Sequence, residues 1–301
     1  MSREVSKKHR LEWLAWRGFR GLMRLLPLRA SLGLGAGLAV AAQDVFGWRK
    51  AETRKRIRQV FPDQPEAWRE RVRREALRNL GRNFVELLWA DRLDDAWLAE
   101  SVDEAEILEQ LTAARAKGKG VLLVIAHAGN WDLAGTVGCR RGLPMCFIAR
   151  KQKNALTYEA LQAIRQHSGG TVVDRDDPQL IRKLLGFLAE NGVVAILVDI
   201  RARGEGEAHE FLGQPCRVSN GLGLLAAKSG AEVVPAALTR SGRSHYWHAF
   251  PARSLPPKAE KSARRTLLQS CLSDLSGELL AHPESYFWFN KRWVLDEPEE
   301  S

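Results

Sequence analysis

The chain has 301 residues, 45% of them hydrophobic and 27% charged, so it can bury one large core or two modest ones. This composition excludes a disordered chain, and the sequence contains no repeat or low-complexity block. The net charge of +10 favours negatively charged partners: nucleic acid, anionic lipid headgroups or phosphorylated substrates. The four cysteines lack CxxC and Cys/His ligand spacing, which argues against a zinc module or a disulfide framework and fits a reducing compartment.

The amino-terminal region combines basic residues with apolar residues at roughly helical spacing. Residues 1–29 hold eight lysines and arginines between Trp13, Trp16, Phe19 and several leucines. This pattern predicts a basic amphipathic helix on anionic lipid, with a helix packed on a soluble domain as the alternative. The uncharged segment 31–43 is shorter than the roughly 20 residues that span a bilayer. We therefore expect an anchoring segment over residues 1–48, which lies on the membrane or inserts as a single N-terminal anchor.

Residues 49–98 continue with two basic helices that are separated at Pro62. Arginine-rich helices can follow the phosphates of nucleic acid. However, the arginines here are spread around the helices, and no nucleic-acid-binding motif accompanies them. We expect no nucleic-acid partner, and we assign these helices to one domain of residues 49–301.

Beyond residue 120, short apolar runs alternate with helical stretches. Alternation of this kind predicts an α/β fold in which a largely parallel central sheet is flanked by helices. The predicted strands are 121–126, 144–149, 170–174, 193–199, 232–238 and 244–250. The predicted helices between them are 131–142, 154–168, 177–191 and 219–229.

Three polar residues follow predicted strands directly: His127, Arg150 and Asp199. In doubly wound sheets, reactive groups gather where the carboxyl ends of the strands meet the following loops. These three positions therefore mark the candidate site.

The segment VLLVIAHAGNWDLAG (121–135) places Asp132 five residues after His127. On one continuous helix the two side chains would not share a face, so the chain must bend between them. Gly129 can supply the bend, and Asn130 can cap a helix that starts near Trp131. Asp132 would then lie in the first helical turn, where its carboxylate could orient His127 as a general base.

No nucleophile accompanies this pair, because the sequence has no G-x-S-x-G elbow and no cysteine tied to a histidine. A base without its own nucleophile suits direct transfer, in which it deprotonates a substrate hydroxyl that attacks a thioester. The HxxxxD spacing alone is not a zinc signature, so we expect no metal and no bound cofactor. An incidental, purely structural pair is the alternative.

The surrounding residues resemble the bacterial lipid A late acyltransferases, the lauroyl and myristoyl transferases, and the related phosphatidylinositol mannoside acyltransferases. The resemblance runs over nearly the whole chain, through HAGNWDLAG, RKQKN (150–154), NGVVAILVDIRARGEG (191–206), EFLGQPCRVSNGLGLLAAKSGAEVVPAAL (210–238) and HPESYFWFNKRW (282–293). It implies a glycerolipid-acyltransferase-like fold at the cytoplasmic face of the inner membrane. The implied reaction moves a fatty acyl group from acyl carrier protein or coenzyme A to a hydroxyl of a glycolipid, such as a lipid A precursor.

The resemblance also implies roles for individual residues. His127 is the general base and Asp132 its partner, while Arg150 holds a phosphate of the donor or the acceptor. Asp199 supports the histidine or positions the substrate. Trp288 and Arg292 close the site from the C-terminal side.

Three positions depart from the family pattern. Ile200 stands in place of glutamine, Leu212 in place of the second phenylalanine, and Asn290 in place of the terminal histidine. None of the three is part of the His-Asp pair. The departures therefore affect the predicted substrate more than the predicted reaction class. Two alternatives stay open: an acyltransferase acting on a lysophospholipid or another polar lipid, and a membrane-surface lipid-binding protein without turnover.

Overall fold

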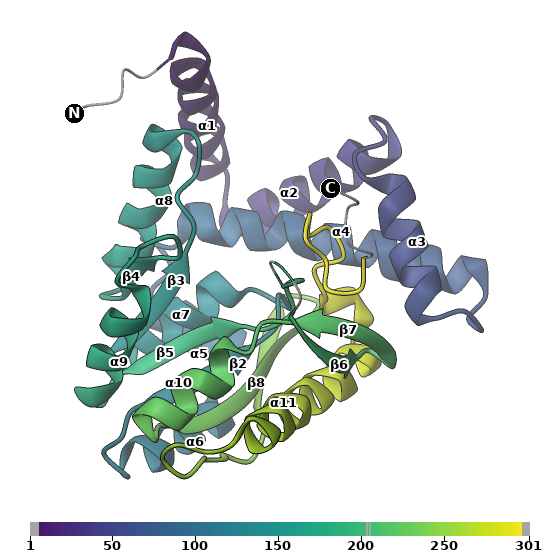
Figure 1. Cartoon of the computed structure of the whole chain (residues 1–301). Coiled ribbons are helices and arrows are strands. Elements are labelled where there is room, and N and C mark those ends of the chain that lie inside the picture. Colours follow the sequence, from purple (N-terminus) through teal and green to yellow (C-terminus); the bar gives the residue numbers. More distant parts are fainter. Residues whose placement is uncertain (1–5, 203, 205, 297–301) are drawn as a thin grey trace.

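The computed structural model describes residues 6–202, 204 and 206–296 and shows a seven-stranded sheet covered by helices (Figure 1). The strand order is β1-β9-β8-β2-β5-β3-β4, and β8, β2, β5, β3 and β4 run parallel. At one edge of the sheet, β9 and β1 run in the opposite direction, because β9 is antiparallel to β8 and β1 is parallel to β9. The predicted α/β fold with a largely parallel sheet is confirmed. The strands are β1 (Val102–Asp103), β2 (Val121–Ile125), β3 (Met145–Ala149), β4 (Thr171–Asp174), β5 (Val193–Leu197), β8 (Glu232–Ser241) and β9 (Ser244–Ala249).

The helices precede, connect and follow these strands. The first four are α1 (Lys7–Leu25), α2 (Leu28–Asp44), α3 (Lys50–Val60) and α4 (Glu66–Trp89). The later ones are α5 (Asp95–Ser101), α6 (Ala105–Arg115), α7 (Trp131–Arg140), α8 (Ala155–His167), α9 (Leu180–Ala189), α10 (Gly221–Ser229) and α11 (Lys261–Ala281), followed by a short 3₁₀ turn (Pro283–Ser285). The helices predicted after residue 120 match α7, α8, α9 and α10.

A two-stranded hairpin that the sequence analysis did not predict lies outside the sheet. It pairs β6 (Glu207–Phe211) with β7 (Gln214–Val218). Its turn residues, Leu212 and Gly213, both have positive φ, as a two-residue turn of this kind requires. Asparagine or glycine is usual at the first position, so a leucine there conceals the turn. Leu212 is buried, and its N–H bonds to Ser276 of α11 at 2.9 Å, which holds the turn in place.

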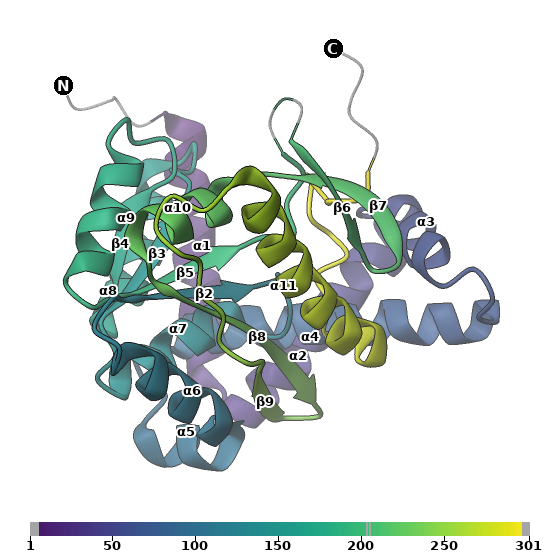
Figure 2. The same cartoon turned by 60° about the horizontal axis from the view of Figure 1, so that its bottom comes forward.

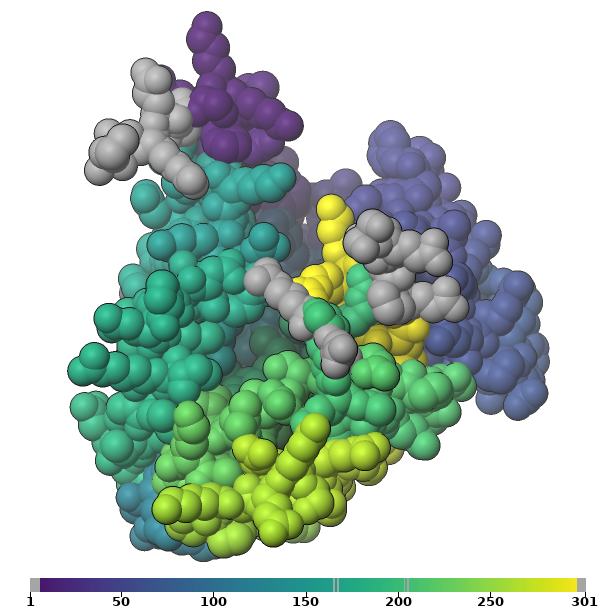
Figure 3. All heavy atoms as spheres, in the orientation of Figure 1, coloured from purple at the N-terminus to yellow at the C-terminus, as the bar shows by residue number. Residues whose placement is uncertain are grey.

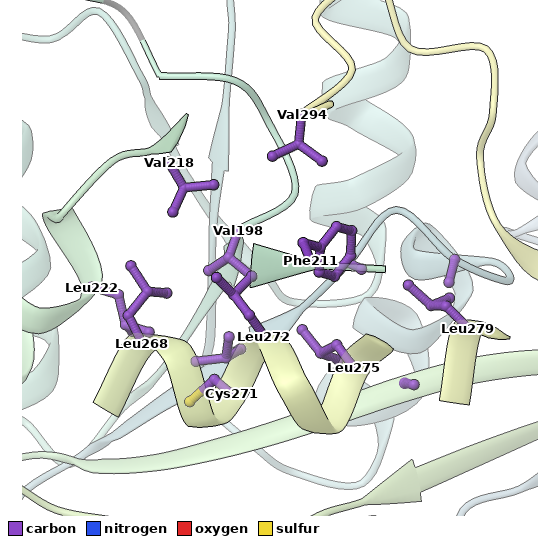
Figure 4. Close-up of a cluster of buried hydrophobic side chains, with 14 of the residues drawn as sticks. Val198, Phe211, Val218, Leu222, Leu268, Cys271, Leu272, Leu275, Leu279 and Val294 are labelled. Carbon is purple, nitrogen blue, oxygen red and sulfur yellow. The ribbon is translucent and has the colours of Figure 1, made fainter. Parts of the chain in front are cut away.

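The two faces of the sheet bury alternate residues of β2. Leu122 and Val124 pack towards α9, α10 and α11, whereas Leu123 and Ile125 face α6 and α7. In Figure 2, α10 and α11 cross the front of the sheet, and Figure 4 shows the buried side chains that α11 contributes, among them Leu272 and Leu275. Because both faces are covered, the carboxyl ends of the strands are where polar groups can gather.

The predicted uncharged segment lies in α2, which packs against α4. A Cβ on Gly81 would lie 2.2 Å from the carbonyl oxygen of Gly35, so the two helices touch backbone to backbone. This close approach requires a residue without a side chain at both Gly35 and Gly81. Among the described residues, no helix is both long and apolar enough to cross a membrane. Helix α1 packs Met23 onto α2 and α4, and it projects at the upper edge of the molecule in Figure 3.

Candidate active site

The register of the sheet brings His127 and Asp199 together. Strands β2 and β5 are parallel neighbours, and Ile125 lies opposite Leu197. Each functional residue follows two positions later, so the two loops leave the sheet side by side. His127 Nδ1 lies 2.8 Å from Asp199 Oδ1, and the His127 backbone N–H donates to Asp199 Oδ2 at 3.0 Å. Because an ionised carboxylate only accepts, Nδ1 carries a proton, and in the neutral ring Nε2 is then the acceptor.

Asp199 is held from the far side by Tyr286. Its carboxylate is 1% exposed and interacts with the Tyr286 hydroxyl, which also accepts a hydrogen bond from Trp293 Nε1 at 3.1 Å. Burial, together with the negative charge of Asp199, raises the pKa of Tyr286, which keeps the phenol protonated and able to donate. The carboxylate therefore has fixed donors on both sides and a single orientation.

The turn after β2 follows the sequence prediction. Gly129 has φ +53°, and a Cβ there would lie 2.0 Å from the carbonyl oxygen of Leu238, so only glycine fits. Asn130 caps α7, since its side-chain oxygen accepts the Leu133 N–H at 3.0 Å. The predicted bend and helix start are confirmed.

The C-terminal segment pairs with this turn. The Phe287 N–H donates to the His127 carbonyl, and the Gly129 N–H donates to the Ser285 carbonyl, each at 2.8 Å. The rings of Trp131 and Phe287 flank the imidazole, with centroids 5.1 and 6.2 Å from that of His127. The histidine is therefore fixed by hydrogen bonds at one nitrogen and by aromatic rings at its sides.

A buried charge cluster supports the turn from α4. Glu86 accepts hydrogen bonds from the Asn130 amide at 2.8 Å and from the Arg240 guanidinium, and it lies 3.3 Å from His245 Nε2. Burial would raise the pKa of Glu86, but the charge of Arg240 and the interaction with His245 outweigh it and lower the pKa to about 2. Burial lowers the pKa of His245, so its ring is neutral and donates to the carboxylate.

A cavity of about 230 Å³ opens beside His127, between the sheet and α7. Its deeper walls are apolar and come from β2, β3, β5 and β9, and its polar residues include His127, Asp132, Arg150 and Gln152. The apolar walls include Leu123, Ile125, Ala134, Met145, Phe147, Ala195, Leu197 and Trp247. Such a cavity suits an apolar chain whose reactive end lies at the imidazole.

The structure brings four of the six predicted site residues to one place. His127 and Asp199 are hydrogen-bonded, and Asp132, in the first turn of α7, lines the same cavity as His127. Arg150 follows β3 at the open end; its side chain is 64% exposed and lies 3.8 Å from Asp176. His127 Nδ1 donates its hydrogen bond to Asp199, and the role of Asp132 as the orienting acid stays a prediction.

Trp288 and Arg292 are placed differently, since neither is among the described residues that line the cavity. Trp288 is buried, and its Nε1–H donates to the Pro283 carbonyl at 2.7 Å. Arg292 donates to the Arg201 carbonyl at 2.6 Å, which fixes the loop that follows Asp199. Both stabilise the C-terminal segment that carries Tyr286 and Phe287, and a contact with substrate stays a prediction.

No pattern in the sequence identified Tyr286, Phe287 or Glu86 as parts of the site. The first two lie within the quoted C-terminal block, where their aromatic neighbours Trp288 and Trp293 conceal them. Glu86 was hidden among the many charges of a basic helix. Its signal was a lone acid between apolar residues, since Val85, Leu87 and Leu88 surround it in the sequence.

The cysteine thiols do not contribute a nucleophile. Burial raises the pKa of Cys139, Cys146 and Cys216 to about 11 and that of Cys271 to about 12, so all four are protonated at neutral pH. Within the described part of the chain, no group of three or more His, Cys, Asp or Glu side chains could hold a metal ion.

Replacing Glu86 tests the buried cluster. Glu86→Gln leaves the Arg240 charge uncompensated and should lower the free energy of unfolding by roughly 3–5 kcal/mol at pH 7. The folded-state pKa of about 2 lies below the usual 4.5, so the carboxylate stabilises the fold fully above pH 4.5 and progressively less towards pH 2. Urea unfolding at several pH values should show the gap between wild type and variant closing over this window.

The exposed Glu66, which pairs with Arg58 and Arg69, provides the control. Glu66→Gln should leave the free energy of unfolding almost unchanged, because water screens an exposed ion pair. A gap between wild type and Glu86→Gln that stays constant from pH 4.5 down to pH 2 would contradict the assigned ionisation of Glu86.

The chain is similar to known proteins over most of its length. Residues 1–294 match the family described as Bacterial lipid A biosynthesis acyltransferase. A lipid A biosynthesis palmitoleoyltransferase of Escherichia coli is 26% identical over 298 residues, which cover 95% of this chain and 92% of that protein. Phosphatidylinositol mannoside acyltransferases are similar too: that of Mycolicibacterium smegmatis is 23% identical, with 93% of this chain and 90% of the relative covered, and that of Mycobacterium tuberculosis is 24% identical, with 81% and 77% covered.

These matches extend over the N-terminal helices, the sheet and the C-terminal segment, and the resemblance seen in the sequence motifs is confirmed. The relatives that match over most of the chain are all named as acyltransferases. The chain belongs to the bacterial lipid A biosynthesis acyltransferase family, and it is an acyltransferase.

Proposed function

We propose that the protein transfers a fatty acyl chain from an acyl thioester to a hydroxyl of a membrane glycolipid, with His127 as the general base. One observation carries this proposal: His127 lines an apolar cavity while a buried carboxylate, Asp199, holds its Nδ1. This arrangement leaves Nε2 as the acceptor for a substrate proton.

The chemistry follows from that geometry. Nε2 removes the proton of the acceptor hydroxyl as its oxygen attacks the thioester carbonyl. Asp199 stabilises the imidazolium that forms. The tetrahedral intermediate collapses, the C–S bond breaks, and the imidazolium returns the proton to the departing thiolate. The products are the ester and the free thiol, and His127 is neutral again.

The start of α7, which carries Asp132, contributes to the proposed reaction in two ways. The first turn of α7 carries the partial positive charge of a helix N-terminus, which favours the oxyanion of the intermediate. Asp132 lines the cavity from that turn, and we assign it the role of a second carboxylate that orients His127 or the acceptor hydroxyl.

The donor enters with its acyl chain in the cavity and its head at the open end. Arg150 is exposed there, and Lys151 and Lys153 follow it in the sequence. A guanidinium is suited to a phosphate, which both acyl carrier protein and coenzyme A carry on the thiol-bearing arm. We therefore propose that one of these two donors docks at this basic rim.

The acceptor is proposed from the relatives. The family description and the Escherichia coli relative name lipid A biosynthesis, and the mycobacterial relatives name phosphatidylinositol mannoside. Both are glycolipids, which favours a sugar hydroxyl over that of a lysophospholipid. A lipid A precursor is the acceptor that we propose.

We also propose that the protein lies peripherally on the cytoplasmic face of the inner membrane, through α1. Large apolar side chains along one side of α1 are exposed, while its opposite side packs on the protein. Since arginines and lysines flank them, this surface suits the interface of an anionic bilayer. The exposed apolar residues are Leu11, Leu14, Leu22 and Leu25.

An acyl-transfer assay tests the proposed reaction. Purified protein is mixed with a labelled acyl chain on acyl carrier protein or on coenzyme A. A lipid A precursor and a lysophospholipid are offered together as acceptors, and mass spectrometry identifies the product. His127→Ala should lower the transfer rate by about 10²–10⁴-fold, the usual loss when a general base is removed. The matched control is His248→Ala on β9, where the side chain is 41% exposed and outside the cavity; its rate should be unchanged.

Two outcomes would contradict the proposal. An acylated phospholipid in place of the glycolipid would change the acceptor to a lysophospholipid or another polar lipid. Equal transfer by folded His127→Ala protein and wild type would exclude His127 as the base.

A second variant tests the cavity as the acyl site. Ala195 lies in its apolar wall on β5, and Ala195→Phe should shorten the space for the chain. Each excluded methylene costs about 0.8 kcal/mol, so losing two or more should lower the ratio of long-chain to short-chain transfer rates by about tenfold or more. A series of acyl-carrier-protein donors measures this ratio.

Ala237→Phe is the matched control, because Ala237 is buried on the opposite face of the sheet. It should leave the ratio unchanged even where the rate falls. If the phenylalanine variants do not fold, Ala195→Val and Ala237→Val allow the same comparison. An unchanged ratio of long-chain to short-chain transfer rates in both Ala195 variants would mean that the acyl chain binds elsewhere.

A further inference from the structure

A second cavity lies at the junction of α1 with the end of α4. It has a volume of about 300 Å³, and its wall includes Arg17, Arg20, Arg24 and Arg92 together with Trp16 and Leu25. It shares no lining residue with the cavity at His127. The proposed acyl transfer gives these residues no role.

The cationic groups of this cavity outnumber their carboxylate partner. Asp91 pairs with Arg20 at 3.2 Å and with Arg24 at 2.9 Å, so one negative charge faces four positive ones. Arg24 Nε is buried and finds no hydrogen-bond partner within the described part of the chain. Such an excess of guanidinium donors fits a phosphate, whose oxygens accept several of them at once.

Aromatic rings hold three of the guanidinium groups in place, and that of Arg20 lies 5.7 Å from the ring centroid of Trp16. The Arg17 guanidinium lies 4.5 Å from the ring centroid of Trp13, and the Arg92 guanidinium 5.6 Å from that of Trp89. Stacked arginines lose less conformational freedom on binding than free ones, and the forked geometry distinguishes arginine from lysine at such a site.

Exposed apolar side chains beside the cavity favour a lipid over a soluble compound as the source of the phosphate. Leu25, in the cavity wall, is 83% exposed, and Leu22 of the same helix is 55% exposed. A soluble phosphate compound gains nothing from these apolar side chains. In a bilayer, by contrast, apolar residues of an interfacial helix enter the acyl region while neighbouring arginines lie at the depth of the phosphates.

We propose that this cavity binds the headgroup phosphate of an anionic phospholipid and thereby fixes the orientation of α1 on the membrane. The inference extends the membrane association proposed above and does not depend on the acyl-transfer reaction. Its site is the set Arg17, Arg20, Arg24 and Arg92.

Vesicle flotation tests the site. The full-length protein is mixed with vesicles of phosphatidylcholine alone or of phosphatidylcholine with phosphatidylglycerol. We compare Arg17→Gln/Arg92→Gln with Arg10→Gln/Arg29→Gln, which removes the same charge from exposed positions outside the cavity. Both double variants should bind anionic vesicles more weakly than wild type, because each loses two positive charges. The affinity of Arg17→Gln/Arg92→Gln should fall at least about tenfold further, because this variant also loses charge-assisted hydrogen bonds.

A charge-keeping variant separates a built site from a basic surface. Arg17→Lys/Arg92→Lys should bind anionic vesicles more weakly than wild type, because lysine lacks the fork. Equal losses in the two glutamine pairs, or full binding by the lysine variant, would overturn the site. Calorimetry with glycerol 3-phosphate is the third arm: binding that depends on Arg17 and Arg92, without a difference between vesicle types, would assign the cavity to a soluble phosphate and overturn the lipid.

These measurements need no turnover and can be repeated in the His127→Ala background. The vesicle measurements can therefore contradict the headgroup site without contradicting the acyl-transfer proposal, and the transfer assay can do the reverse. Thermal unfolding of each variant checks that lost binding is not lost folding.

Discussion

The contact between Asp199 and His127 is the constraint on which the rest of the site depends. A buried carboxylate is costly unless donors surround it, and here the backbone and ring of His127 and the hydroxyl of Tyr286 do so. The parallel register of β2 and β5 makes the contact possible, because both residues leave the sheet at the same level. Inserting or deleting one residue in either loop would separate His127 from Asp199.

Segments from both ends of the chain hold this pair in place. Helix α4 reaches the turn through Glu86 and Asn130, and the C-terminal segment reaches it through Ser285 and Phe287. Arg56 of α3 in turn holds the C-terminal segment, donating to the Trp288 carbonyl at 2.6 Å. The helices before the sheet therefore fix the geometry of the loop that carries His127. This dependence agrees with a family match that runs from residue 1 to residue 294.

The sequence was sufficient for six of the seven strands of the sheet, the glycine bend and the helix cap, because each depends on a local pattern. It did not predict the two-residue β1. It was not sufficient for the choice between Asp132 and Asp199 as the residue on Nδ1. That choice depends on which strands are neighbours and in what register, and periodicity does not encode either. The roles of Tyr286 and Glu86 were hidden for the same reason, since each acts across more than 40 positions of sequence. The β6–β7 turn was missed because packing holds Leu212 in a conformation that leucine rarely adopts.

The most direct test of this account is the position of the proton on His127. Nitrogen NMR of histidine-labelled protein, at a pH where the ring is neutral, reports which nitrogen is protonated, and loss of the signal in His127→Gln assigns it. Asp199 on Nδ1 predicts a proton on Nδ1 and a free lone pair on Nε2, and Asp199→Asn should disturb that state. A neutral ring protonated on Nε2 in the wild type would contradict His127 as the base that faces the cavity.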